Sequence, residues 1–201
     1  MTGLKKTIYI IGFVVIIAAA AAFIFRDELT KVFFKPTDSS IPEANTGFNA
    51  SVLTVADNLE TPWGMAFLKN GDVLVTERSG TLKRIAENSQ SFPISGVTET
   101  GEGGLLGIAL HPDFNNNGFL YLYSTYRNGG ALLNRVERYT YTNDALTQKL
   151  IIIDRIPGAS THDGGAIAFG PDNKLYITTG DAGNADSAQD TTSLSGKILR
   201  V

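Results

Sequence analysis

The sequence predicts an all-β fold: a partial β-propeller of about three blades, preceded by one N-terminal transmembrane helix. Three observations support this prediction. An apolar run lies near the N-terminus, short apolar strands separated by Gly, Asn and Asp turns fill the later part of the chain, and one pattern of strands recurs three times. We therefore divide the chain into an anchor (1–31), a linker (32–47) and a propeller domain (48–201).

Residues 7–25 are uncharged and almost wholly apolar. At a rise of about 1.5 Å per residue, a helix of this length crosses the hydrocarbon core of a bilayer. Lys5 and Lys6 precede the run and mixed charges follow it, which favours a cytoplasmic N-terminus and an exported domain. A cleaved signal peptide is the alternative, because the alanines at 18–22 offer small residues for cleavage. We expect a signal-anchor helix that holds the domain on the periplasmic or cell-surface side of a membrane.

The segment 32–47 has the composition of a tether. It contains Pro36, Pro42, Gly47 and two serines. Pro and Gly interrupt regular structure, so we expect a linker between the membrane and the domain.

Three units of the domain share one pattern: a short strand, a turn, an apolar strand and a strand with a basic tip. Ala66, Ala109 and Ala168 mark the register, at spacings typical of one propeller blade and of one blade with an insertion. A β-sandwich has similar short strands, but it would not repeat this register. Since propellers close with about four to eight blades, we expect a fragment of a longer protein, or a ring that needs further blades or a second copy.

The third unit brings two titratable residues to one end of a predicted hairpin. His162 precedes the strand 166–169, and Asp181 follows the strand 175–178. Two strands joined by a tight turn bring their far ends together, so the two side chains can meet. A carboxylate beside an imidazole fixes the tautomer and stabilises the imidazolium, as a general base requires. The alternative for His162 is a structural histidine bonded to a loop carbonyl.

Composition argues against several other kinds of site. The chain has no cysteine, which excludes disulfides, a thiol nucleophile and Cys-ligated zinc. Its net charge of −3 gives no indication of a nucleic-acid partner. His111 has no second histidine at ligand spacing and is expected to be structural. The segment 113–118 begins like a calcium loop, but Ser124 stands where the bidentate Glu is required, so we expect a turn and assign no metal ligand; a weak calcium site is the alternative.

Four segments together resemble the quinoprotein glucose/sorbosone dehydrogenase family, the soluble aldose sugar dehydrogenases that use pyrroloquinoline quinone (PQQ). The segments are 59–67, 101–114, His162 with Gly165, and 170–183. The family is a six-bladed propeller, so the resemblance covers only its N-terminal half.

The resemblance implies roles for three residues. His162 corresponds to the general base, which takes the proton of the anomeric hydroxyl while hydride passes to the quinone. Asp181 corresponds to the aspartate that orients this base. Glu102, in the segment Gly-Glu-Gly-Gly-Leu-Leu, corresponds to a polar residue near the cofactor. The family's basic clamp on the quinone carboxylates and its calcium-binding carbonyls belong to later blades.

The expected function is therefore that of a membrane-tethered, PQQ-dependent sugar dehydrogenase that oxidises an aldose to its lactone, here in its N-terminal part. The alternative is a non-catalytic, extracytoplasmic propeller that binds a protein or a glycan, because one fold hosts both roles. A lactonase-type propeller hydrolase would need several metal-ligating acids converging on the channel, and this sequence supplies no convincing set.

Overall fold

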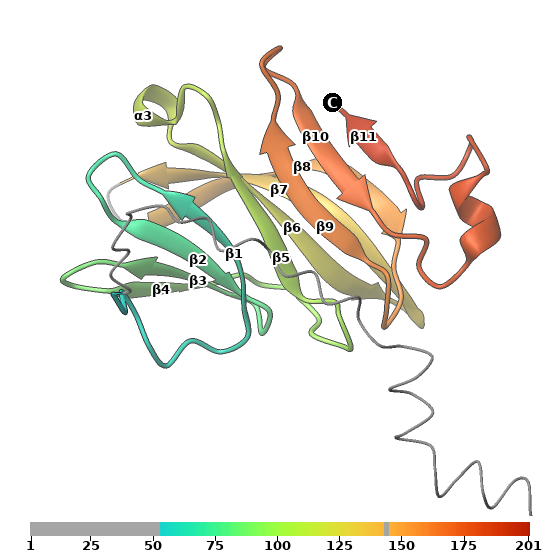
Figure 1. Ribbon diagram of the computed structural model, residues 1–201, viewed down its shortest axis with the longest axis horizontal. Helices are drawn as coiled ribbons and strands as arrows, with labels where there is room; N and C mark the ends of the chain where they lie inside the picture. Colours follow the sequence, from blue (N-terminus) through green and yellow to red (C-terminus); the bar gives the residue numbers. More distant parts are fainter. Residues whose placement is uncertain (1–52, 143–144) are drawn as a thin grey trace, which may run out of the picture. The chain divides into compact units, whose positions relative to one another are not determined.

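The computed structural model describes residues 53–142 and 145–201 (Figure 1). All the described elements lie in the compact unit Thr54–Val201. The predicted anchor helix at 7–25 and the predicted linker lie outside the described residues. Within the part that the structure describes, no helix is long and apolar enough to cross a membrane.

The described strands form three antiparallel sheets in which consecutive strands are neighbours. Sheet 1 contains β1 (Pro62–Phe67), β2 (Val73–Glu77), β3 (Thr81–Ile85) and β4 (Gln90–Pro93). Sheet 2 contains β5 (Leu105–Leu110), β6 (Phe119–Asn128), β7 (Ala131–Thr142) and β8 (Ala145–Pro157). Sheet 3 contains β9 (Gly164–Phe169), β10 (Leu175–Thr179) and β11 (Ile198–Arg200). Two short helical turns, α3 (Phe114–Asn117) and η1 (Ala185–Ala188), lie in connections.

The predicted repeat is confirmed, because each sheet begins with the strand that carries the marker alanine. Ala66, Ala109 and Ala168 lie in β1, β5 and β9, and each pairs with a residue of the second strand of its sheet. The outer strands β4 and β8 were not predicted. They bury one residue each, Phe92 and Ile156, so their sequences lack the alternation that identifies a half-buried strand.

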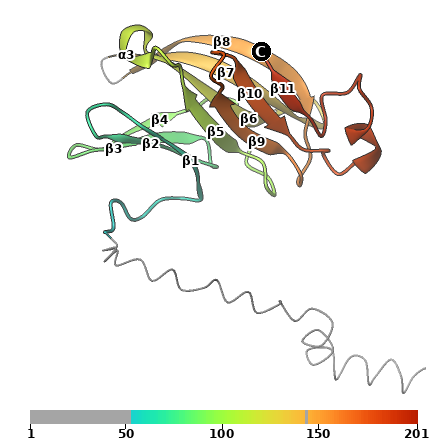
Figure 2. The same ribbon diagram turned by 45° about the horizontal axis from the view of Figure 1, so that its top comes forward.

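The three sheets stack face to face in the manner of propeller blades. The first strands lie side by side, β1 against β5 and β5 against β9 (Figure 2). Leu105 and Ile108 of β5 pack into the core shared with sheet 1, whereas Leu106 and Ala109 pack into the core shared with sheet 3. Strand β5 of sheet 2 therefore has side chains buried on both of its faces. The hydroxyl of Thr76 adds a polar link, since it donates to the carbonyl of Leu106 at 2.6 Å.

One face of sheet 1 is apolar and exposed. Met65 and Phe67 of β1 are 64% and 70% exposed, on the side opposite Ala66, which packs against the core. Such a face is expected for a blade without a neighbour on that side. That further blades or a second copy cover it stays a prediction.

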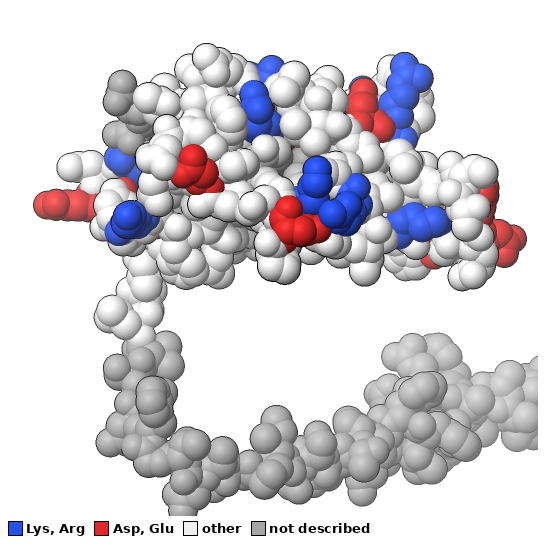
Figure 3. Space-filling view, turned by 90° about the horizontal axis from the view of Figure 1, so that it is seen from above, with Lys and Arg blue, Asp and Glu red and all other residues white. Residues whose placement is uncertain are grey.

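Charged side chains are interspersed by sign on the face shown in Figure 3, among wide areas without Lys, Arg, Asp or Glu. Two acids lie in the interior with cationic partners. Lys83 lies 2.8 Å from Glu77, and Lys149 lies 2.7 Å from Glu137. These pairs satisfy buried charges and contribute to the scaffold.

Candidate active site

The β9–β10 hairpin brings His162 and Asp181 together. Its strands pair from Leu175 with Phe169 beside the turn to Thr179 with Gly164 at the far end. His162 lies just before β9 and Asp181 just after β10. Nδ1 of His162 lies 2.9 Å from Oδ1 of Asp181. The hairpin thus produces the contact that its sequence predicts, at the end of the hairpin away from the turn.

The electrostatics of this pair define the state of the imidazole. The hydrogen bond from His162 lowers the pKa of Asp181, and a second bond from the N–H of Gly183 adds to this effect. Asp181 is therefore an ionised acceptor at neutral pH, and the neutral imidazole must carry its proton on Nδ1 to donate to it. The side chain of His162 is 61% exposed, so the lone pair of Nε2 can accept a proton from a bound molecule.

The pair predicts a specific pH dependence. The hydrogen bond and charge of Asp181 raise the pKa of His162, so Asp181→Asn should lower it toward the ordinary value of about 6.5. In the wild type, the raised pKa of His162 stabilises the folded protein. This contribution is complete at pH values below the ordinary histidine pKa and is lost as the pH rises through the raised pKa of His162. On the acid side, it is lost as the pH falls through the lowered pKa of Asp181.

An NMR titration of the imidazole signals measures this shift. The chain has only two histidines, so His111 provides an internal reference. Asp190→Asn is the matched control, because this neighbouring acid bonds to Thr192 instead. A His162 titration that is the same with and without the Asp181 carboxylate would refute the coupling.

The main chain of His162 is held on both sides. Its φ of 59° lies in the left-handed region, which is uncommon for a residue with a side chain. Its carbonyl accepts a hydrogen bond from the N–H of Ala182 at 3.2 Å, and its N–H donates to Oε2 of Glu102 at 2.7 Å. Gly180 packs against the same carbonyl so closely that a Cβ there would lie 1.6 Å from the oxygen. These contacts therefore fix the position of the His162 main chain, from which the imidazole extends.

Glu102 reaches His162 from the neighbouring sheet. It lies in the turn before β5, and its own N–H donates to the carbonyl of Ser160 at 2.8 Å. His162 is thus in direct contact with both of the other candidate residues, through its main chain with Glu102 and through its side chain with Asp181.

A buried polar chain behind His162 was missed by sequence reasoning. Asp163 is only 2% exposed, and its Oδ1 accepts a hydrogen bond from Asn134 at 2.8 Å. Asn134 in turn accepts from Thr125, and the hydroxyl of Tyr123 donates to the main-chain carbonyl of Asp163. Burial raises the pKa of Asp163. The signal was present as polar residues at inward positions of β6 and β7, where the alternation requires apolar ones.

An open hollow of about 500 Å³ lies beside the pair. Lys197 borders it, and its ammonium donates to the carbonyls of Ser187, Ala188 and Ser195 at 3.2, 2.9 and 2.6 Å. These bonds hold the loop that follows Asp181 against β11. The hollow is lined by His162, Thr178, Thr179, Gly180, Asp181, Ala188, Gly196, Lys197 and Ile198.

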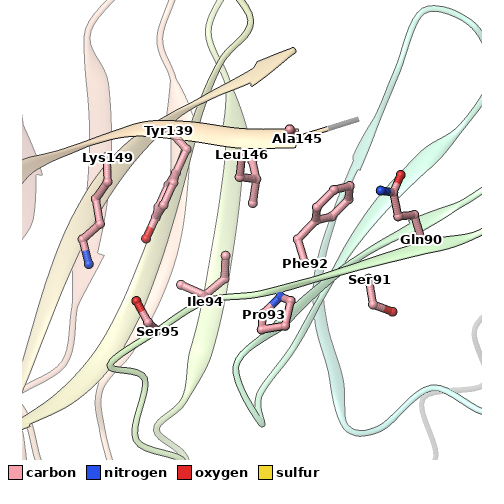
Figure 4. Close-up of a pocket in the computed structure, with 10 residues that line it drawn as sticks. All are labelled: Gln90, Ser91, Phe92, Pro93, Ile94, Ser95, Tyr139, Ala145, Leu146 and Lys149. Atoms are coloured by element: carbon pink, nitrogen blue, oxygen red, sulfur yellow. The ribbon is translucent and has the colours of Figure 1, made fainter. Parts of the chain in front are cut away.

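A second hollow, of about 430 Å³, lies between β4 and the β7–β8 pair (Figure 4). Phe92 and Ile94 form one wall, and Tyr139 and Leu146 form the other. Lys149 also lines it, but its ammonium is paired with the buried Glu137. The residues of this hollow offer no equivalent of the histidine–carboxylate pair, so the candidate active site is the hollow beside His162.

The geometry of the His162–Asp181 pair supports proton transfer. An exposed imidazole with an ionised carboxylate on Nδ1 is the arrangement of a general base. Within 53–142 and 145–201, no group of three or more His, Asp or Glu side chains could hold a metal ion.

Comparisons with known proteins identify the family of this chain. The family described as glucose/sorbosone dehydrogenase matches residues 59–201. Aldose sugar dehydrogenase YliI of Escherichia coli is 33% identical over 161 residues, which cover 75% of this chain and 43% of the relative. Quinoprotein glucose dehydrogenase B of Acinetobacter calcoaceticus is 32% identical over 144 residues, with coverage of 64% and 30%.

A solved structure shows the same likeness. The PQQ-bound aldose sugar dehydrogenase of Streptomyces coelicolor superposes with a TM-score of 0.68 at 38% identity, over 76% of this chain and 47% of that one. This chain spans less than half the length of each of these three relatives. The match nevertheless extends over every described strand, from β1 to β11, and over the histidine–carboxylate pair. The chain therefore belongs to the glucose/sorbosone dehydrogenase family of PQQ-dependent sugar dehydrogenases.

Proposed function

We propose that this chain provides the proton-accepting part of a PQQ-dependent aldose sugar dehydrogenase, which oxidises an aldose to its lactone. One observation carries the proposal: the exposed imidazole of His162, bonded through Nδ1 to Asp181 at 2.9 Å, stands beside an open hollow. The PQQ bound to the Streptomyces relative supports the choice of cofactor.

The chemistry of a cyclic aldose requires such a base. Its oxidation removes a proton from the anomeric hydroxyl and a hydride, with two electrons, from the anomeric carbon. In this proposal Nε2 of His162 takes the proton, and the Asp181 carboxylate stabilises the imidazolium that forms. PQQ, when bound, supplies the acceptor for the hydride.

The described residues fit this cofactor only in part. PQQ carries three carboxylates, which need cationic partners. Lys197 is the one lysine or arginine among the residues that line the hollow, and its ammonium already donates to three carbonyls. The lining therefore suits proton abstraction but does not supply a clamp for the carboxylates. The basic clamp and the calcium expected from later blades remain predictions.

We also propose that the domain works on the extracytoplasmic side of a membrane, held by a signal-anchor helix at 7–25. The long uncharged run after Lys5 and Lys6 supports this proposal. Extraction of cell membranes with alkaline carbonate tests it, since an integral anchor stays in the membrane pellet. Release of the protein into the supernatant would refute the anchor.

The enzymatic proposal makes a prediction about substrates. The full-length protein, supplied with PQQ and Ca²⁺, should reduce a redox dye when given an aldose such as glucose. Methyl glucoside should give no reduction, because its anomeric oxygen carries a methyl group in place of the proton that His162 removes. Equal rates with both sugars, or reduction that does not depend on PQQ, would contradict the proposal.

A further inference from the structure

We propose that Glu102 is a positioning residue: its carboxylate clamps the main chain of His162 from the neighbouring sheet and so keeps the imidazole on Asp181. The importance of His162 for activity rests on the proposed function. The clamp itself rests on contacts between sheets 2 and 3.

Glu102 grips the His162 loop at two points. Its N–H donates to the carbonyl of Ser160 at 2.8 Å, and its Oε2 accepts from the N–H of His162 at 2.7 Å. One residue therefore holds both ends of the tripeptide Ser160–His162. A bond between a carboxylate and an N–H is stronger than one between neutral groups, so the second contact is the firmer one.

The turn that presents Glu102 is built for close contact. Thr100 and Gly103 bond to each other through their main chains, at 3.3 and 2.9 Å, and Glu102 projects from the turn between them. Gly101 has a φ of 55°, and a Cβ there would lie 1.9 Å from the carbonyl oxygen of Ser160. The guanidinium of Arg78 contacts the carbonyl of Gly101 and holds the turn from sheet 1. The lack of a side chain at Gly101 thus lets the turn pack closely against the loop that contains His162.

The backbone conformation of His162 explains why it needs a clamp. A non-glycine residue at a φ of 59° stays there only when its surroundings hold it. Ala182 holds the carbonyl side of His162, and Glu102 holds the N–H side. Without Glu102, one of these two restraints is lost, and the imidazole is free to leave the position at which it meets Asp181.

The charges around His162 agree with this role. Asp181 has the largest effect on its pKa and raises it, and the nearby charge of Glu102 raises it further. The other ionisable groups beside it are Asp163, whose pKa burial raises, and Lys197, whose ammonium is held by carbonyls. Glu102 therefore also favours the imidazolium that forms when His162 accepts a proton.

Two substitutions of Glu102 distinguish its effect on the position of His162 from the effect of its charge. Glu102→Gln keeps an oxygen that can accept from the His162 N–H but removes the charge, whereas Glu102→Ala removes both. Glu99→Gln is the matched control, since this acid of the same loop lies 3.6 Å from Arg78 rather than at His162. Labelling the full chain with ¹⁵N-histidine gives two amide signals, from His162 and from the reference His111.

In Glu102→Gln, the His162 amide proton should move upfield as the charged acceptor is lost, and the imidazole should titrate at lower pH. Asp181→Asn should lower the pKa of His162 much less in the Glu102→Ala variant than in the wild type. The reason is that the side chains of His162 and Asp181 no longer meet once Glu102 is removed. The control should change neither signal. With an active enzyme, kcat of Glu102→Ala should fall by up to about 10²-fold.

An unchanged His162 amide in Glu102→Gln would overturn the clamp. So would an Asp181→Asn effect of the same size in Glu102→Ala and in the wild type. Both measurements use histidine signals and need no turnover. A protein without dehydrogenase activity would refute the proposed function and leave this test intact.

Discussion

Replacing His162 by glutamine is expected to lower kcat for aldose oxidation by about two to four orders of magnitude and to leave the fold intact. Glutamine has no basic nitrogen, so the proton of the anomeric hydroxyl would have to pass to water. Its amide can still donate a hydrogen bond toward Asp181. Because the His162 side chain is 61% exposed, little packing is lost. The measurement is kcat and KM with PQQ and an aldose, together with a thermal melt of both proteins.

The pH profile distinguishes a base from a residue that only shapes the site. Wild-type activity should rise as the pH passes the raised pKa of His162, because only the neutral imidazole accepts a proton. The residual activity of His162→Gln should lack this rise. His111→Gln is the control, since this second histidine packs among Phe119, Tyr121 and Phe169 away from the hollow. A His162→Gln enzyme that keeps both its kcat and the acid limb would exclude His162 as the base.

The contact between His162 and Asp181 was predictable because it depends on local geometry. The turn at 170–173 closes with a bond from the N–H of Asn173 to the carbonyl of Gly170, and Asn173 has a φ of 58°. Asparagine tolerates that conformation, so the turn can be recognised in the sequence. Once the hairpin is defined, its far ends must lie together. The same reasoning identified the first two strands of every sheet.

Contacts between sheets were not predictable in this way. Glu102 and His162 are 60 residues apart, and their hydrogen bond depends on how the turn before β5 meets the loop before β9. Neither segment has a periodicity that specifies such a meeting. The resemblance implies that Glu102 lies near a cofactor, which stays a prediction, and it gave no indication of the contact with the main chain of His162. Asp163 and Asn134 illustrate the same limit, because their bond joins a loop to β7 of another sheet.

Gly180→Ala is expected to reduce kcat by about 10²-fold and to destabilise the domain by about 1–3 kcal/mol. The new Cβ would lie 1.6 Å from the carbonyl oxygen of His162 and 3.0 Å from the N–H nitrogen of Asp163. Both are main-chain atoms, so no side-chain rotation can relieve the overlap. The His162 loop must move away from the strand end that carries Asp181, which breaks the bond from Ala182 and separates the imidazole from its carboxylate.

Gly130→Ala is the matched control for this substitution. Nothing lies within 4 Å of a Cβ at Gly130, in the β6–β7 turn, so the same chemical change should alter stability by less than about 0.5 kcal/mol and leave kcat unchanged. Urea unfolding and dye-reduction rates for both variants make the comparison. In ¹⁵N-histidine spectra, Gly180→Ala should shift the His162 amide and spare His111. If Gly180→Ala instead keeps wild-type kcat and the wild-type His162 signal, then the position of the imidazole does not depend on the close contact between these two loops, and the geometric basis of the site is wrong.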